Sequence, residues 1–315
     1  MKKRILSIDG GGIKGVFPIS FLAEIESALS LQTVADYFDL IAGTSVGGII
    51  ALGLGLGLSA REMTDFFVNE GPRIFPRHPI PTSTIRLLFG RQRYHPDPLR
   101  KALQRVFGSK TLADSQVRLL IPAFDATEAD IHIYKTAHQA RLGMDYRLSA
   151  VEVALATAAA PTYFPAYDSK HCIALVDGGI WANDPVALAV VEGIGVLGWA
   201  GEEIHVLSIG CGEETIDFKQ KGHGGIFWIR RAIEAAMRGQ SRSAVGMARH
   251  LTGRDKGVEN VVRINPSVAA GRFFLDDASG IRDLSGFGYG QARHALPEIK
   301  DRFFSREAEP FVSIA

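Results

Sequence analysis

Ser45 lies in a pattern that can turn a serine into a nucleophile. It is the central residue of Gly43-Thr44-Ser45-Val46-Gly47, with apolar residues 40–42 before this stretch and 49–52 after it. A short strand that turns tightly into a helix exposes such a serine at the helix N-terminus, where backbone N–H groups favour developing negative charge. We expect one of Gly43 and Gly47 to adopt a strained dihedral and the other to let the helix approach the strand. The pentapeptide alone also fits an ordinary Gly-rich turn.

A second glycine-rich stretch, Asp9-Gly10-Gly11-Gly12-Ile13-Lys14-Gly15, follows an apolar strand expected at residues 4–8. Such a turn presents unpaired N–H groups to an anion, which suits an oxyanion or a phosphate. Its Gly-x-Gly-x-x-Gly spacing fits a dinucleotide-binding loop, but the Ser45 turn stands where that fold needs an acidic residue. The run does not end in Gly-Lys-Ser or Gly-Lys-Thr, which excludes a Walker A loop. We therefore predict an oxyanion hole made by the amides of Gly10, Gly11 and Gly12, with a nucleotide-binding module as the alternative.

Asp177 is the candidate general base. It follows the apolar run Ile173–Val176 and precedes Gly178 and Gly179. A free aspartate has a pKa of about 3.9, a poor match for a serine hydroxyl, and burial between apolar strands would raise it. The Gly-marked turn at Asp177 is thus expected to supply a carboxylate of increased basicity.

A Ser–Asp–His triad is the alternative to a carboxylate acting alone. The order Ser, Asp, His is available with Ser45, Asp177 and either His205 or His223. His205 lies inside a strand expected at residues 204–209, where a satisfied core histidine is the simpler interpretation, whereas His223 lies in a Gly-rich loop and stays a candidate. The remaining histidines lack metal-binding spacing such as His-Glu-x-x-His, so we predict neither a metal nor a cofactor.

The segments between these motifs alternate between strands and helices. We expect strands at 4–8, 116–125, 131–134, 173–176 and 204–209, and helices from Val16 onward and at 149–160, 186–197 and 226–250. This alternation predicts an α/β fold with a mostly parallel sheet covered by helices on both faces. Because the carboxyl ends of parallel strands share one edge, the three Gly-marked turns can converge there.

Composition limits the class of protein. The chain has 315 residues, 46% apolar and 22% charged, with a net charge of +1, which is typical of a globular protein and excludes a globally basic DNA or RNA binder. Two cysteines, Cys172 and Cys211, are too few for a disulfide framework and favour a reduced, cytoplasmic setting. Residues 41–60 carry no charge, but their six glycines make a poor membrane-spanning helix. We expect one domain, 1–315, with the motifs in a core at 4–212 and the segment 213–315 packed on it in a regulatory role.

Two stretches are rich in arginine and lysine. In residues 73–105 eight basic side chains are opposed only by Asp97, and residues 219–263 also contain more basic than acidic side chains. A solvated surface explains both stretches, and so does contact with an anionic surface or ligand. The segment 273–315 contains no motif that we can interpret.

Taken together, the three motifs resemble those of the patatin-like phospholipases in order and separation, over roughly residues 4–212. The resemblance implies a three-layer α/β/α fold, a Ser45–Asp177 dyad without histidine, an oxyanion hole at Gly10–Gly12 and hydrolysis of acyl esters in lipids. Lys14 stands where many members carry a basic residue, which adds positive potential near the oxyanion. The supporting positions of the motifs are Gly15, Gly43, Gly47, Gly178 and Gly179.

Residues 156–165 and 177–185 are most similar to one bacterial branch of that family, the phospholipases of anti-phage signalling that a cyclic dinucleotide activates. This narrower resemblance implies a latent enzyme that is cytoplasmic, binds the messenger and then degrades phospholipids at the surface of the inner membrane, with homo-oligomer formation on activation as an option. Residues 73–105 and 230–263 are candidates for the messenger site. A soluble esterase or thioesterase remains a further alternative.

Overall fold

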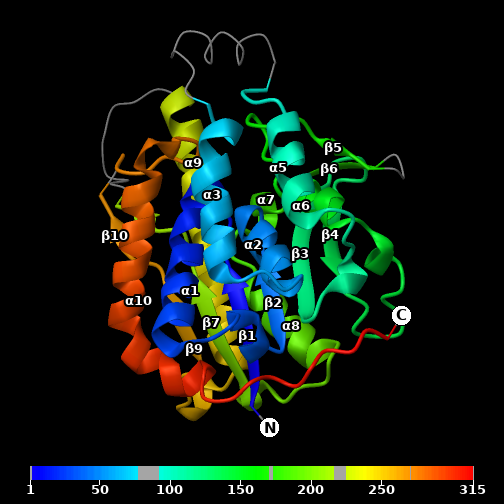
Figure 1. Cartoon of the computed structure of the whole chain (residues 1–315), viewed down its shortest axis with the longest axis vertical. Helices are drawn as coiled ribbons and strands as arrows, with labels where there is room; N and C mark the ends of the chain where they lie inside the picture. Colours follow the sequence, from blue (N-terminus) through cyan, green and yellow to red (C-terminus); the bar gives the residue numbers. More distant parts are fainter. Residues whose placement is uncertain (1, 77–91, 170–172, 216–224, 270, 315) are drawn as a thin grey trace.

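An eight-stranded sheet organises this computed structural model, which describes residues 2–76, 92–169, 173–215, 225–269 and 271–314. The five parallel strands are β1 (Lys3–Ile8), β2 (Leu40–Gly43), β3 (Arg118–Asp125), β7 (Ile204–Ile209) and β9 (Val261–Ile264). The other three are β4 (Asp130–Lys135), β5 (Tyr167–Asp168) and β6 (Ala174–Asp177). The strand order is β5-β6-β3-β2-β1-β7-β9, with β4 also paired to β3 (Figure 1).

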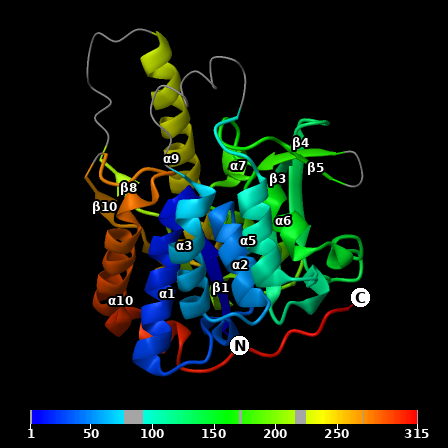
Figure 2. The same ribbon diagram turned by 45° about the horizontal axis from the view of Figure 1, so that its top comes forward.

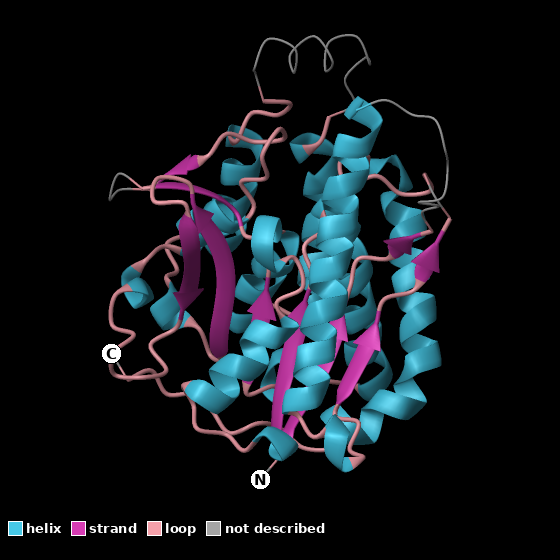
Figure 3. Ribbon diagram, turned by 180° about the vertical axis from the view of Figure 1, so that it is seen from behind, coloured by secondary structure: helices cyan, strands magenta, loops and turns pink. Residues whose placement is uncertain are grey.

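Helices cover the sheet on both faces. They are α1 (Val16–Leu29), α2 (Val46–Gly55), α3 (Ala60–Ile74), α5 (Asp97–Phe107), α6 (Ala150–Thr157), α7 (Gly179–Ala182), α8 (Val186–Gly195), α9 (Gly225–Leu251) and α10 (Ile281–Phe303). Two short strands, β8 (Glu213–Glu214) and β10 (Ser267–Val268), form a separate pair. Seen from behind, the long helix α9 lies in front of the sheet and runs roughly along its strands (Figure 3).

Successive side chains along the strands point to opposite faces of the sheet and so belong to two different apolar cores. Leu6 and Ile41 belong to the core shared with α1, α2, α3, α5, α6 and α10, whereas Ile5 and Leu40 belong to the core shared with α8 and α9. Both faces are therefore buried, which explains why the strands are apolar at nearly every position. The predicted three-layer arrangement is confirmed.

The strand β6 departs from the parallel arrangement that we expected to bring the turns together. It runs antiparallel to β3, with Asp177 opposite Ala123. Residues 120–125 of β3 pair with β4 along one edge, so β2, which pairs with 118–120, and β6, which pairs with 123–125, share the other edge. The carboxyl ends of β2 and β6 therefore face each other. Asp177, at the end of β6, therefore faces the Ser45 turn at the end of β2 from the opposite direction. The two turns do not lie next to each other along one edge of a parallel sheet, as we expected.

The C-terminal segment packs on the sheet from two sides. Helix α10 lies along α1 (Figure 2), where Ser285 and Ser20 share a 2.8 Å hydrogen bond and the rings of Phe287 and Phe17 are 5.5 Å apart. Helix α9 packs on α8 on the opposite face. The final residues then cross the end of the sheet that carries the N-terminus (Figure 1).

Most element boundaries lie within a few residues of those expected. The largest difference is α6, which ends at Thr157 although the alanine-rich pattern continues to Ala160. The reason is that residues 158–160 form turns that approach β6, where the Ala159 carbonyl accepts the Asp177 N–H at 3.0 Å. Within the residues that the structure describes, none of the helices combines the length and apolar character needed to cross a membrane.

Candidate active site

Ser45 occupies a strained turn between β2 and α2. Its φ of 56° and ψ of −121° lie in a region that L-residues rarely adopt, and it is the N-cap of α2. Our expectation that a glycine would carry the strain is wrong, since neither Gly43 nor Gly47 has a positive φ. Both are needed for close approach instead: a Cβ would lie 2.1 Å from the Gly47 carbonyl oxygen if placed on Gly43, and 2.3 Å from the Ile8 carbonyl oxygen if placed on Gly47.

Two buried threonines fix this turn, and no sequence motif pointed to a role for either. The Ser45 N–H donates to Thr157 Oγ1 at 3.0 Å, and that hydroxyl donates to the Pro122 carbonyl at 2.6 Å. The Thr44 hydroxyl donates to the Ala182 carbonyl at 2.6 Å. The only sequence signal for Thr157 is that it interrupts an alanine-rich run. These bonds tie the Ser45 turn to β3 and to the loop that carries Asp177.

Asp177 is held beside Ser45. The Ser45 side chain is close enough to its carboxylate to lower the pKa of Asp177, and its Oδ1 accepts the Gly179 N–H at 2.7 Å. Burial raises the pKa of Asp177 to about 6, against the opposing effect of the Ser45 side chain and the Gly179 N–H. The expected carboxylate of increased basicity is therefore present, in contact with the hydroxyl that it would deprotonate.

The glycine-rich loop lies against Ser45. A Cβ placed on Gly10 would be 3.3 Å from the Ser45 Cβ, which shows how closely the loop approaches. The Gly10 N–H already donates to the Asn183 carbonyl at 2.9 Å, and the Ile13 N–H donates to the Leu275 carbonyl at 2.8 Å. Among the described residues the amides of Gly11 and Gly12 have no hydrogen-bond acceptor. Of the three amides predicted for the oxyanion hole, these two are available to a ligand.

The remaining motif positions support the same turns. A Cβ placed on Gly15 would lie 2.3 Å from a methyl group of Val46. A Cβ placed on Gly178 would lie 2.4 Å from the Pro122 carbonyl oxygen. Lys14 is partly exposed and follows the loop, with its N–H bonded to the Gly11 carbonyl at 3.1 Å. The motif glycines are therefore packing positions around the Ser45 and Asp177 turns.

The described histidine of the triad alternative lies far from this site along the sheet. His205 pairs in register with Arg4, near the start of β1, whereas the site lies beyond the ends of β1 and β2. Burial lowers its pKa to about 4, and its Nδ1 is buried without a hydrogen-bond partner among the described residues, so it is not the satisfied core histidine that we expected. His223 lies outside the described residues. The structure thus brings Ser45 together with Asp177 and leaves His205 apart.

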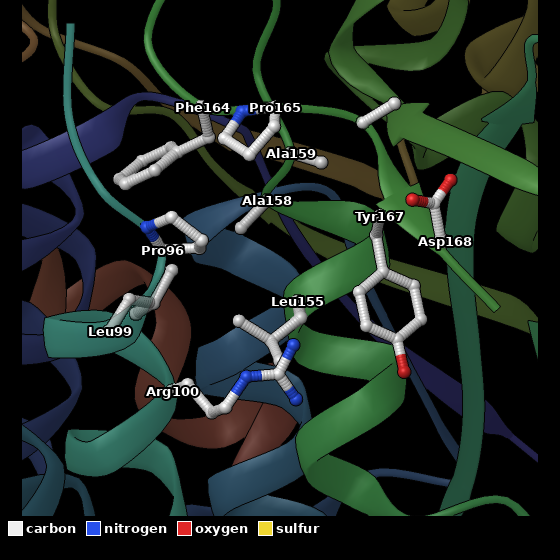
Figure 4. Close-up of a pocket in the computed structure, with 11 residues that line it drawn as sticks. Pro96, Leu99, Arg100, Leu155, Ala158, Ala159, Phe164, Pro165, Tyr167 and Asp168 are labelled. Carbon is white, nitrogen blue, oxygen red and sulfur yellow. The ribbon is translucent and has the colours of Figure 1, made fainter. Parts of the chain in front are cut away.

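A cavity of about 260 Å³ lies beside the turn that holds Asp177 (Figure 4). It is lined mainly by apolar side chains of α5, α6 and residues 164–166, with Arg100, Tyr167 and Asp168 as polar members. Its wall includes Ala159, whose carbonyl accepts the Asp177 N–H. The cavity is therefore linked to Asp177 through the backbone of Ala159, while neither Ser45 nor Asp177 lines it.

Many arginines of the two basic stretches are already paired with acidic side chains. The ion pairs are Arg73 and Arg105 with Glu70, Arg93 with Asp276, Arg238 and Arg242 with Glu213, Arg249 with Glu259, and Arg263 with Asp9. These acidic partners reduce the positive potential that the sequence suggested. Among the described side chains, no group of three or more His, Cys, Asp or Glu residues is arranged to hold a metal ion.

Residues 6–190 match the family model described as patatin-like phospholipase, which is more than half of the chain. The chain belongs to the patatin-like phospholipase family. Similar relatives include a cGAMP-activated phospholipase of Vibrio cholerae, 33% identical over 88% of this chain and 86% of the relative. Another of the same name, from Escherichia coli, is 30% identical over 98% of this chain and 94% of the relative. Among solved structures, VipD of Legionella pneumophila aligns with 94% of this chain and 67% of its own at 13% identity and a TM-score of 0.47.

This patatin-like phospholipase is a hydrolase, as the resemblance in its motifs implied. The region that matches the family model extends from β1 to α8 and contains the Ser45 turn, the glycine-rich loop and Asp177. The α9, β9 and α10 elements lie outside that region.

Proposed function

We propose that this protein hydrolyses acyl esters of membrane glycerophospholipids with Ser45 as nucleophile and Asp177 as base. The observation that carries the proposal is the position of the Ser45 side chain beside a buried carboxylate whose pKa is raised to about 6. A carboxylate of that pKa is ionised at neutral pH and is a stronger base than a free aspartate.

The reaction divides into two steps. Asp177 takes the Ser45 proton as Oγ attacks the acyl carbonyl carbon, and the developing oxyanion is held by the amides of Gly11 and Gly12 together with the N-terminus of α2. The collapse of this intermediate breaks the ester bond, and Asp177 returns the proton to the departing alcohol oxygen of the lysophospholipid. Asp177 then takes a proton from water as the water attacks the acyl carbonyl carbon. The bond between the acyl group and Ser45 Oγ breaks as Asp177 returns the proton to Oγ, which releases the fatty acid and restores Ser45.

The apolar surroundings of the site support a lipid substrate. Ile180, one residue beyond Gly179, is 54% exposed, and Phe274 and Leu275, next to the glycine-rich loop, are 48% and 38% exposed. Exposed apolar side chains at a site mouth suit contact with a bilayer surface. The cavity beside Ala159 offers an apolar space for part of an acyl chain. We therefore place the active enzyme at the surface of the inner membrane.

We also propose that a cyclic dinucleotide activates this enzyme, with cGAMP as the first compound to test. The support is that relatives covering 88% and 98% of this chain bear the name cGAMP-activated phospholipase. The prediction is low basal turnover that rises when cGAMP is added. Size-exclusion chromatography with and without cGAMP tests whether activation is accompanied by self-association.

The experiment measures fatty-acid release from phospholipid vesicles with and without cGAMP, for wild type, Ser45→Ala and Asp177→Ala. The matched controls are Ser27→Ala and Asp65→Asn, which change exposed residues of α1 and α3. We expect both site variants to lose activity while the controls keep it. Full activity of either site variant contradicts the dyad. Turnover of short soluble esters alone would favour an esterase, and an unchanged rate with a panel of cyclic dinucleotides would reject activation only.

A further inference from the structure

Arg263 of β9 lies at the centre of a buried cluster of charges that the sequence motifs do not include. Its Nη1 donates to Asp9 Oδ1 at 2.7 Å and to Ser208 Oγ at 2.7 Å, and its Nη2 donates to Asp9 Oδ2. The same Nη1 lies 3.2 Å from Asp184 Oδ2. The side chains of Arg263, Asp9 and Asp184 are only 12%, 6% and 0% exposed. One guanidinium is therefore shared by two buried carboxylates, and burial raises the pKa of Asp9 to about 7 despite this partner.

The two carboxylates belong to the two loops of the candidate site. Asp9 immediately precedes Gly10, and Asp184 immediately follows Asn183. The Gly10 N–H donates to the Asn183 carbonyl at 2.9 Å, so the loops also touch directly at these neighbouring residues. Arg263 thus holds the glycine-rich loop and the Asp177 loop at the point where they meet.

Helix α9 also binds Asp184, through Gln240 and Ser241. Gln240 accepts the Asp184 N–H with Oε1 at 3.1 Å and donates to the Asp184 carbonyl with Nε2 at 3.1 Å. The Ser241 hydroxyl donates to Asp184 Oδ2 at 3.0 Å. The main chain and the side chain of Asp184 are therefore both held by the C-terminal segment.

The chemistry of the cluster depends on the shape of the guanidinium as well as on its charge. Burial lowers the pKa of Arg263, but Asp9 and Asp184 outweigh that effect and raise it above its ordinary value, so Arg263 stays charged. Its planar fork bonds both oxygens of Asp9 at once, which a lysine cannot do. Buried ion pairs are often no more stabilising than apolar packing, so a cluster of this kind is better explained by the geometry that it imposes.

We propose that Arg263 and Gln240 are positioning residues through which the C-terminal segment holds the two catalytic loops in register over Ser45. This inference rests on the proposed function. Arg263 acts through Asp9 on the amides of Gly11 and Gly12, and Gln240 acts through Asp184 on the loop that carries Asp177. A shift of α9 or β9 changes both loops together, which makes this cluster the route by which the C-terminal segment controls turnover.

The test compares Arg263→Lys and Gln240→Ala with wild type and with Arg293→Met. Arg293 is a matched control, because it also makes an arginine–carboxylate pair from the C-terminal segment, with Glu24 at 2.7 Å, but on α10 and α1. Turnover is measured on vesicles and divided by the number of active sites that a fluorophosphonate titrates. This ratio is insensitive to a loss of folded protein, so a merely structural role would leave it unchanged.

We expect kcat per titrated site to fall at least about tenfold in Arg263→Lys and in Gln240→Ala, with KM within about twofold, because losing one oxyanion donor alone typically costs about 10²–10³ in rate. Hydrogen exchange of peptides covering residues 9–15 and 177–185 should rise together in both variants and stay unchanged in Arg293→Met. If kcat per titrated site and the exchange of both loops match wild type, the inference is wrong. Hydrogen exchange can be measured without turnover, so it tests the positioning role even if the proposed function is wrong. A wild-type protein that hydrolyses no phospholipid would show that the proposed function itself has failed.

Discussion

Replacing Asp177 by asparagine should make the protein more stable while it removes activity. Burial raises the pKa of the Asp177 carboxyl from 3.8 to about 6, so the folded protein disfavours the ionised form. A rise of about two pKa units corresponds to about 3 kcal/mol of free energy of unfolding that wild type loses at neutral pH. Asparagine resembles the protonated carboxyl: its oxygen still accepts the Gly179 N–H, and its amide faces the Ser45 hydroxyl.

The sign of the pH dependence distinguishes this effect from a simple packing change. Because the folded pKa is raised, folded wild type retains a proton between about pH 4 and pH 6 that the unfolded chain has released, so its stability falls as the pH rises through that range. Asp177→Asn has no such proton. The variant should be about 3 kcal/mol more stable than wild type at pH 8, and about half of that difference should remain at pH 5.

Urea denaturation of both proteins at pH 5 and pH 8 measures the difference, and the other titrating groups cancel in the comparison. Asp65→Asn, an exposed position on α3, should change stability little at either pH. A variant that is no more stable than wild type at pH 8, or a difference that is equal at the two pH values, would refute the reasoning about burial. It would also remove the main physical support for Asp177 as a base.

Three further predictions concern the same site. Since Asp177 must be ionised to accept a proton, kcat/KM on an uncharged ester should fall about tenfold per pH unit below about pH 6 and be level above it; a flat profile from pH 5 to 8 would contradict this. Ser45→Gly should melt at a higher temperature than Ser45→Ala, by the equivalent of about 1 kcal/mol, because glycine adopts φ 56° and ψ −121° without strain. Thr157→Val leaves the Ser45 N–H without its acceptor, so we expect it to cost about 2 kcal/mol of stability and to lower kcat more than KM, as denaturation and vesicle assays would measure.

Local sequence pattern was sufficient to predict the residues that would do the chemistry. The Ser45 turn, the glycine-rich loop and Asp177 each follow an apolar strand, and the alternation of strands and helices predicted the layered sheet. Local pattern does not contain strand direction, so the antiparallel course of β6 and its end-to-end meeting with β2 were not foreseen. The same limit explains why a strained backbone was assigned to a glycine when the structure places it at the serine.

Residues that act through long-range contacts were not foreseeable from spacing. Arg263 is separated from Asp9 by 254 positions and stood in the sequence as one of many basic residues. The Gly10 N–H donates to the main-chain carbonyl of Asn183. Every residue has such a carbonyl, so the sequence does not indicate which one accepts this hydrogen bond. Only the folded chain distinguishes the amides that remain available from those already bonded.

The hydrogen bond from Ile13 to the Leu275 carbonyl has a consequence for protein synthesis. A ribosome makes Ser45 and Asp177 in the first three fifths of the chain, long before it reaches the residues that brace the glycine-rich loop from the other end. A nascent or prematurely terminated polypeptide that lacks residue 275 therefore contains Ser45 and Asp177 but not the carbonyl that fixes the Ile13 end of the glycine-rich loop.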